Sequence, residues 1–273
     1  MKLQDKLLQL KAERKAILAV NFYNFETLSG ILQAASMIKM PVILQLSESS
    51  INYMGLTVAA SMAKAALREF GVEGWLHLDH GGSVEIVKSC LDAGFDSVMI
   101  DASEKTLDEN IRITRQVVKV ATSYNVNVEA ELGFVAKLDQ KQSEQRFTRP
   151  DDATRFVNST GVNALAIAIG SSHGFYKQAP KLNIGLLSRI SENISTPLVL
   201  HGCSGIPDTM LQEAIRNGIC KINLATEIKN TFMVALKKRL KNNSEIDLRI
   251  VFPDATQAVV DLIIKKLNTI HQA

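Results

Sequence analysis

The sequence predicts a single α/β domain folded as a (β/α)8 TIM barrel, and two patterns support this prediction. Short apolar, β-branched runs alternate with amphipathic helical patterns, and eight such units fit within the 273 residues. Each strand run is apolar throughout, as is typical of parallel strands that helices cover on both faces. An open doubly wound sheet is the alternative, but no GxGxxG turn follows the first strand. We therefore expect the closed barrel.

The expected strands and helices alternate along the whole chain. Strands are expected over 16–22, 41–47, 74–81, 97–103, 126–133, 164–170, 197–202 and 221–226. The first four helical patterns cover 26–39, 52–70, 83–94 and 106–125, and a helix candidate follows each later strand. An extra amphipathic helix is expected at the C-terminal end, over 252–273. No linker or change in composition divides the chain, so residues 1–273 are expected to form one domain.

Composition excludes several classes of protein. The chain has 31 basic and 28 acidic residues, a net charge of +3, which is too even to indicate a nucleic-acid surface. Its charged start lacks the apolar segment of a signal peptide, and no apolar run approaches the roughly 20 residues that span a membrane. Cys90, Cys203 and Cys220 are an odd number without CxxC spacing, which favours free thiols in a reducing compartment. We expect a cytoplasmic protein with no membrane or nucleic-acid partner.

Carboxylates gather at the carboxyl ends of the expected strands. The run "LHLDHGG" over 76–82 ends the third strand with Asp79 beside a histidine, and Asp101 follows the fourth strand. Glu129 and Glu131 belong to the end of the fifth strand. Barrels of this type carry their chemistry on this face, so these side chains are candidates for an active site.

Three histidines share the same expected face. His80 ends the third strand, while His173 and His201 follow the sixth and seventh. Three imidazoles with an open position form a catalytic zinc arrangement. Their spacing along the chain matches no short metal motif, so the prediction rests on the shared face. The alternative is that they are hydrogen-bonded polar residues filling the mouth of the barrel.

The last two strands are followed by loops that favour phosphate binding. "HGCSG" over 201–205 and "INLAT" over 222–226 offer backbone N–H groups, with hydroxyls from Ser204 and Thr226. Barrels commonly hold a phosphate at this position. Ordinary glycine-rich turns are the alternative.

Taken together, these segments resemble the class II, zinc-dependent ketose-bisphosphate aldolases over nearly the whole chain. The resemblance is carried by "HLDHG", "SVMIDAS", "VEAELG", "AIGSSHG", "LVLHGCSG" and "KINLATEIKN". It is strongest to the tagatose-bisphosphate aldolase branch, since fructose-type members place an aspartate where this chain has Ala225. The resemblance implies a lyase that reversibly cleaves a tagatose- or fructose-type ketose 1,6-bisphosphate. The products would be dihydroxyacetone phosphate and an aldehyde such as glyceraldehyde 3-phosphate.

The resemblance also implies roles for individual residues. His80, His173 and His201 would bind Zn²⁺, and Asp79 would move the proton of the hydroxyl at the cleaved bond. Glu131 and Asp101 would be carboxylates close to the metal. The phosphate of the dihydroxyacetone phosphate half would contact Gly174, Gly202, Ser204, Asn223 and Thr226, and the second phosphate would lie near Lys229.

Two further properties come with the resemblance. Backbone carbonyls around Ser172, Gly174 and Gly202 resemble the monovalent-cation site of the family, which takes Na⁺ or K⁺. A homodimer or homotetramer is also implied.

The segment after Glu131 departs from the family pattern. Members usually carry a Gly-Gly-X-Glu-Asp loop whose glutamate moves the proton at the enediolate carbon, and here the chain reads "FVAKLDQKQSE". Asp139 is the first candidate for this base and Glu144 the second. Alternatively, the loop serves a modified ketose phosphate, with an anion facing Lys137, Lys141, Arg146 and Arg149, or its charges are simply solvated. A non-catalytic zinc-binding member and a metal-dependent hydrolase on the same barrel are the remaining alternatives.

Four other polar residues receive simpler interpretations. His77 is expected inside the third strand as a hydrogen-bonded core residue, and Cys203 as a packing residue and not a nucleophile. Asn21 and Ser47, at the ends of the first two strands, are further candidates for substrate contact.

Overall fold

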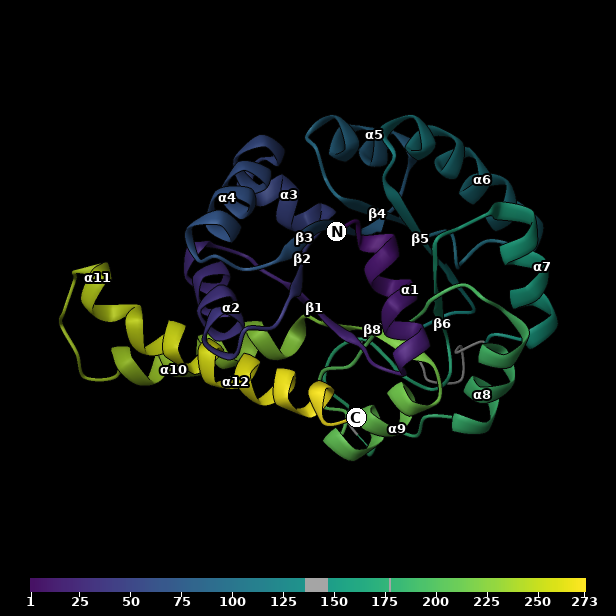
Figure 1. Cartoon of the computed structure of the whole chain (residues 1–273). Helices are drawn as coiled ribbons and strands as arrows, with labels where there is room; N and C mark the ends of the chain where they lie inside the picture. Colours follow the sequence, from purple (N-terminus) through teal and green to yellow (C-terminus); the bar gives the residue numbers. More distant parts are fainter. Residues whose placement is uncertain (136–146, 177) are drawn as a thin grey trace.

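Eight parallel strands close into a barrel in chain order in the computed structural model, which describes residues 1–135, 147–176 and 178–273 (Figure 1). The predicted (β/α)8 barrel is confirmed. Every expected strand is present, although β8 begins at Ile219, before the expected Lys221. The strands are β1 (Ile17–Asn21), β2 (Val42–Ser47), β3 (Gly74–Gly81), β4 (Ser97–Ile100), β5 (Asn127–Leu132), β6 (Ala164–Ile167), β7 (Leu198–Leu200) and β8 (Ile219–Leu224).

Helices surround the barrel as a ring (Figure 1). The helices expected over 26–39, 83–94 and 106–125 are present within two residues of those bounds. The single helix expected over 52–70 is wrong, because Gly55 has a φ of 83°, a left-handed value that interrupts the helix. The ring helices are α2 (Phe25–Ile38), α3 (Glu48–Met54), α4 (Leu56–Glu69), α5 (Val84–Asp92), α6 (Leu107–Tyr124), α7 (Pro150–Thr160), α8 (Ile184–Asn193) and α9 (Asp208–Arg216).

The C-terminal part adds helices beyond the eight units. The predicted extra helix is present as α12 (Pro253–His271), preceded by α10 (Thr226–Leu240) and the short α11 (Leu248–Val251). Helix α12 approaches α2 closely, because a Cβ on Gly30 would lie only 3.0 Å from side-chain atoms of Val259. Figure 1 shows α10, α11 and α12 extending to one side of the ring. Within the described part of the chain, no helix combines the length and apolarity needed to cross a bilayer.

Helix α1 (Leu3–Glu13) closes the amino-terminal end of the barrel and lies inside the ring in Figure 1. Its buried leucines pack with residues from the barrel interior in one apolar cluster, which includes Leu3, Leu7, Leu10, Ile17, Ile43 and Trp75. This helix is not among the expected elements, although leucines at positions 3, 7 and 10 have the spacing of a helix face.

Above this apolar layer the barrel interior is polar. Lys221, Glu129 and His77 come from β8, β5 and β3, which are not neighbouring strands, yet their side chains contact one another. Such contacts are possible only across the inside of the barrel. All three side chains are buried. The barrel therefore changes from apolar at its closed end to charged near the carboxyl ends of its strands.

The closing helix predicts a large difference between two neighbouring leucines. Leu7 is 0% exposed and Leu8 is 44% exposed. Leu7→Ala leaves a cavity under the barrel and is expected to lower the free energy of unfolding by about 2–5 kcal/mol. Leu8→Ala, the matched control, is expected to change it by no more than about 0.5 kcal/mol. Urea unfolding of both variants measures the difference. Equal effects would contradict the conclusion that α1 closes the amino-terminal end of the barrel.

Candidate active site

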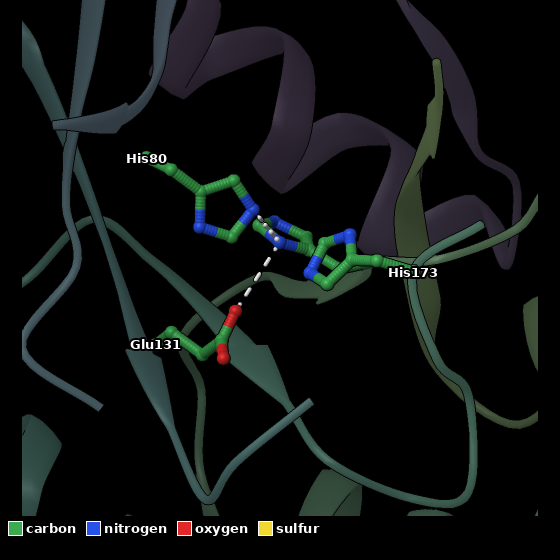
Figure 2. Close-up of side chains that lie close together, drawn as sticks. His80, Glu131 and His173 are labelled. Atoms are coloured by element: carbon green, nitrogen blue, oxygen red, sulfur yellow. Dashed lines mark hydrogen bonds and ion pairs between the residues drawn. The ribbon is translucent and has the colours of Figure 1, made fainter. Parts of the chain in front are cut away.

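Four predicted site residues meet at the carboxyl ends of the strands. Each of His80, Glu131, His173 and His201 offers one ligand atom, and these atoms all lie within 4.8 Å of one another. The ring centroid of His80 lies 4.7 Å from that of His201 and 5.0 Å from that of His173. Figure 2 shows the rings of His80 and His173 and the carboxylate of Glu131 pointing toward a common centre. We call these four residues the His/Glu cluster.

A distorted backbone brings His80 into the cluster. Consecutive side chains of a regular strand point to opposite faces, so Asp79 and His80 could not both face the mouth of the barrel. His80 has a φ of 52°, in the left-handed region that few non-glycine residues adopt, and the pairing of β3 with β4 shifts register between Leu78 and Gly81. The bulge explains why a carboxylate and an imidazole can end the same strand. It also explains Gly81, where a Cβ would lie 2.6 Å from the carbonyl oxygen of Met99.

His201 is held from behind by Glu129. Its Nε2 lies 2.9 Å from Glu129 Oε1, and both side chains are buried. Its other nitrogen, Nδ1, lies 3.1 Å from His80 Nε2 and 3.2 Å from Glu131 Oε2. Glu129 therefore lies outside the His/Glu cluster and orients one of its rings.

Asp101 has the equivalent position behind His80. Its Oδ2 lies 2.7 Å from His80 Nδ1, while its Oδ1 accepts hydrogen bonds from the backbone and hydroxyl of Ser103. Burial works against its charge, but these hydrogen bonds hold the pKa of Asp101 below its usual range. The ring of His80 therefore lies between Asp101 and the centre of the cluster.

The histidines of the cluster have opposite proton affinities. Burial, together with the charges of His80 and His201, lowers the pKa of His173 to about 3. Burial also disfavours charge on His201, but the neighbouring carboxylates of Glu129 and Glu131 raise its pKa to about 10. At neutral pH, His173 is therefore a free lone-pair donor, while a metal must displace a proton from His201.

The His/Glu cluster fits a metal ion in two respects: its ligand atoms, and the carboxylates that hold its histidines. Glu131 Oε2 is buried and forms no hydrogen bond within the described residues. Histidine ligands of metals usually donate their second N–H to a carboxylate, and His80 and His201 each have such a carboxylate behind them. Three imidazoles and a carboxylate are ligands that suit Zn²⁺.

Asp79 lies beside the cluster and is held by two amides. Asn21 Nδ2 donates to its Oδ2 at 2.9 Å, and Asn223 Nδ2 donates to its Oδ1 at 3.4 Å. Asp79 Oδ1 lies 3.9 Å from His80 Nε2. Burial works to raise the pKa of Asp79, but the neighbouring His80 and His201, with the amide of Asn21, bring it below its usual value. Asn223, predicted to contact phosphate, therefore contacts Asp79 in this structure.

The loops after β6 and β7 lie against each other. A Cβ on Gly202 would overlap the carbonyl of Ser172, so only glycine fits there. The Tyr176 hydroxyl accepts a hydrogen bond from the Ser172 backbone and donates to the Gly202 carbonyl at 2.8 Å. Gly174, also in this segment, has a φ of 92°. Tyr176 has no role in the sequence analysis, because no motif around it points to this bridge.

The remaining predicted phosphate residues surround the start of α10. Ser204 Oγ accepts a hydrogen bond from the backbone N–H of Glu227 at 3.1 Å, and Thr226 is the first residue of that helix. Lys229 Nζ lies 5.3 Å from the ring centroid of Tyr23, a cation–π contact. The structure therefore places these residues at one helix start.

A cavity of about 400 Å³ opens beside the cluster. His80 and His173 line it, together with Asp101, Glu104 and Lys105. A volume within the range of small-molecule sites, next to titratable groups, is typical of an active site.

Several expectations fall on the segment that the structure does not describe. Asp139, Glu144, Lys137, Lys141 and Arg146 all lie within 136–146, so the proposed loop base and most of the basic residues are outside the described residues. Arg149 is described, and its side chain is 76% exposed and paired with Asp152.

Two of the simpler interpretations agree with the structure. His77 is fully buried and hydrogen-bonded to Ser97, as expected for a core histidine. Cys203 is buried, and burial raises the pKa of its thiol to about 12, so it is not an activated nucleophile.

Comparison with known proteins decides the family. The family model described as "Fructose-bisphosphate aldolase class-II" matches residues 1–273. This chain belongs to that family. It is therefore a class II aldolase, a carbon–carbon lyase.

The proteins similar to this aldolase carry names with two different substrates. A fructose-bisphosphate aldolase from Giardia intestinalis is 34% identical, and the match covers 99% of this chain and 93% of the relative. The D-tagatose-1,6-bisphosphate aldolase subunit GatY from Klebsiella oxytoca is 33% identical over 97% of this chain and 96% of its own length. Among solved structures, the YdjI aldolase from Escherichia coli K12 has a TM-score of 0.89 and 32% identity, covering 98% of this chain and 96% of the other.

The carboxylate behind His80 yields a prediction for metal affinity. Asp101→Asn keeps the shape of the side chain but removes the charge that orients the ring, so Zn²⁺ is expected to bind about 10- to 100-fold more weakly. Asp108→Asn changes a 77% exposed carboxylate that pairs with Arg155 and serves as the control. Competition with a chromogenic chelator measures both affinities. An Asp101→Asn protein with the affinity of the control would contradict the supporting role.

Proposed function

We propose that this protein is a zinc-dependent aldolase that reversibly cleaves a tagatose- or fructose-type ketose 1,6-bisphosphate. The products are dihydroxyacetone phosphate and glyceraldehyde 3-phosphate. The proposal rests on one observation above all, the juxtaposition of the His/Glu cluster with a buried carboxylate, since Asp79 Oδ1 lies 3.9 Å from His80 Nε2. A metal-ligand set and a proton acceptor in contact are what this cleavage requires.

The described residues divide the work of the reaction. His80, His173 and His201, with Glu131 beside them, would hold Zn²⁺, which would supply Lewis-acid stabilisation of developing negative charge, worth several kcal/mol. Asp79 accepts the proton of the substrate hydroxyl as the carbon–carbon bond breaks. Its lowered pKa keeps it ionised and ready to accept at neutral pH.

Two asparagines position the base and face the substrate. Their Nδ2 groups hold Asp79, while Asn21 Oδ1 and Asn223 Oδ1 are buried without a hydrogen-bond partner among the described residues. Buried acceptors of this kind favour contact with substrate hydroxyls. Asn223 thus has two proposed roles, on the substrate and on Asp79.

The two ends of the substrate are assigned to the loops of β6, β7 and β8. We assign the phosphate of the dihydroxyacetone phosphate half to the segment that includes Gly174, Gly202, Ser204 and Thr226, and the second phosphate to Lys229. We also assign a monovalent cation, Na⁺ or K⁺, to the backbone carbonyls around Ser172, Gly174 and Gly202, because the loops that carry them lie against each other.

Residues near β1 and β8 determine which ketose bisphosphate the site accepts. Fructose-type members carry an aspartate at the position of Ala225. The Tyr23 hydroxyl lies 3.5 Å from the carbonyl oxygen of Ala225. The departure favours a tagatose-type substrate, and the altered loop leaves a modified ketose phosphate as the second candidate. We further propose a homodimer or homotetramer in the cytoplasm, a location that the unpaired, buried Cys90, Cys203 and Cys220 support.

The proposed function predicts chelator-sensitive cleavage. A coupled assay for dihydroxyacetone phosphate compares tagatose 1,6-bisphosphate, fructose 1,6-bisphosphate and the two 1-monophosphates, with and without chelator. Release is expected from a bisphosphate, with tagatose ahead of fructose, and Zn²⁺ is expected to restore activity after chelation. Release that ignores the chelator would contradict zinc dependence, and zinc binding without release from any of the four would favour the modified substrate or a non-catalytic role.

Two substitutions separate metal binding from proton transfer. His173→Ala is expected to lose Zn²⁺ and activity together. Asp79→Ala is expected to retain Zn²⁺ while kcat falls about 10²- to 10⁴-fold, the usual contribution of a positioned base. Zinc content and steady-state rates measure both effects, with the exposed Asp108→Ala as control. A fully active Asp79→Ala protein would contradict the proposed mechanism.

A further inference from the structure

A buried lysine lies beneath the His/Glu cluster, and neither the family resemblance nor the proposed reaction uses it. Lys221, on β8, is 1% exposed. Its Nζ donates to Glu129 Oε2 at 2.6 Å and lies 3.2 Å from His77 Nε2. A buried ammonium group is costly unless it is paired, so its presence here requires an explanation.

Hydrogen-bond direction provides that explanation, beginning on the His77 side. An ammonium group has three donors and no acceptor, so His77 Nε2 must accept from Lys221. The ring proton of His77 then sits on Nδ1 and points at Ser97 Oγ, which lies 2.8 Å away. Burial and the charge of Lys221 lower the pKa of His77 to about 3, in agreement with a neutral, accepting ring.

The same constraint extends to the metal ligand. Glu129 Oε2 accepts from Lys221, and Glu129 Oε1 lies 2.9 Å from His201 Nε2. Glu129 therefore accepts hydrogen bonds on both of its oxygens. Because this carboxylate has no proton to donate, a neutral His201 must carry its ring proton on Nε2. The lone pair of His201 then sits on Nδ1, the nitrogen that lies 3.2 Å from Glu131 Oε2 inside the cluster.

We propose that Lys221 is a positioning residue for the metal centre: through Glu129 it fixes the tautomer and orientation of His201, so that Nδ1 presents its lone pair to the metal. The inference deepens the proposed function and rests on its metal site. Lys221 acts through Glu129 and touches neither the His/Glu cluster nor the cavity of about 400 Å³ beside it.

A purely structural role makes a different prediction. If Lys221 only neutralised Glu129 in the core, its loss would lower stability and leave the metal site unchanged. If it fixes His201, its loss must change metal affinity and the ligand field even in a folded protein. Lys266 provides a matched control, because it is 5% exposed and pairs with Glu227 at 3.2 Å, and none of its described ion pairs involves His201 or Glu129.

The experiment compares Lys221→Met with Lys266→Met in the full chain. Co²⁺ titration followed by visible absorption reports the affinity and geometry of the site, chelator competition reports Zn²⁺ affinity, and urea unfolding reports stability. Lys221→Met is expected to bind both ions about 10- to 100-fold more weakly and to change the Co²⁺ spectrum, whereas Lys266→Met binds them as the wild type does. Wild-type affinity and spectrum in a folded Lys221→Met protein would overturn the proposal.

A second measurement keeps the proposal testable if Lys221→Met does not fold. Long-range ¹⁵N–¹H correlation of the wild-type protein, with ¹⁵N-labelled histidine, reports the tautomer of each ring. His77 is expected as the Nδ1–H tautomer with or without metal, and zinc-loaded His201 as the Nε2–H tautomer. The opposite tautomer of either ring would overturn the proposal. A wild-type protein that binds neither ion would instead refute the metal centre itself, and the tautomer of His77 would still show whether Lys221 directs these hydrogen bonds.

Discussion

Carboxylates buried inside a barrel need partners, and this requirement organises the site. Glu129 is 1% exposed, and an isolated charge at such a position would be strongly destabilising. Lys221 on β8 and His201, directly after β7, satisfy its two oxygens, while Glu129 lies on β5. Only a closed barrel brings these strands around one interior. The geometry of the His/Glu cluster above therefore depends on the polar layer below it.

Local backbone distortion completes what the closed barrel begins. A regular β3 would send Asp79 and His80 to opposite faces, and the left-handed conformation at His80 brings both to the mouth of the barrel. Asp101, directly after the next strand, then holds the ring in place. Strained conformations of this kind persist where surrounding contacts impose them, and here one lets the adjacent Asp79 and His80 face the same side of the barrel.

The sequence predicts the large-scale design well because the signals are local. Apolar runs followed by helical patterns show the eight units, and polar residues at strand ends show the face that carries the His/Glu cluster. What the sequence does not predict depends on distant partners. In the sequence, Lys221 is a single charged residue in an apolar strand. Its partner Glu129 is 92 residues away in the chain. The position of Asp101 behind His80, and the break at Gly55, likewise follow from backbone geometry that residue types alone do not specify.

X-ray absorption at the zinc K-edge of the zinc-loaded protein tests the central claim most directly. The account predicts one bound Zn²⁺ with imidazole nitrogens at about 2.0–2.1 Å, completed by oxygen and without sulfur. A zinc–sulfur distance of about 2.3 Å, or zinc without imidazole ligands, would contradict the account.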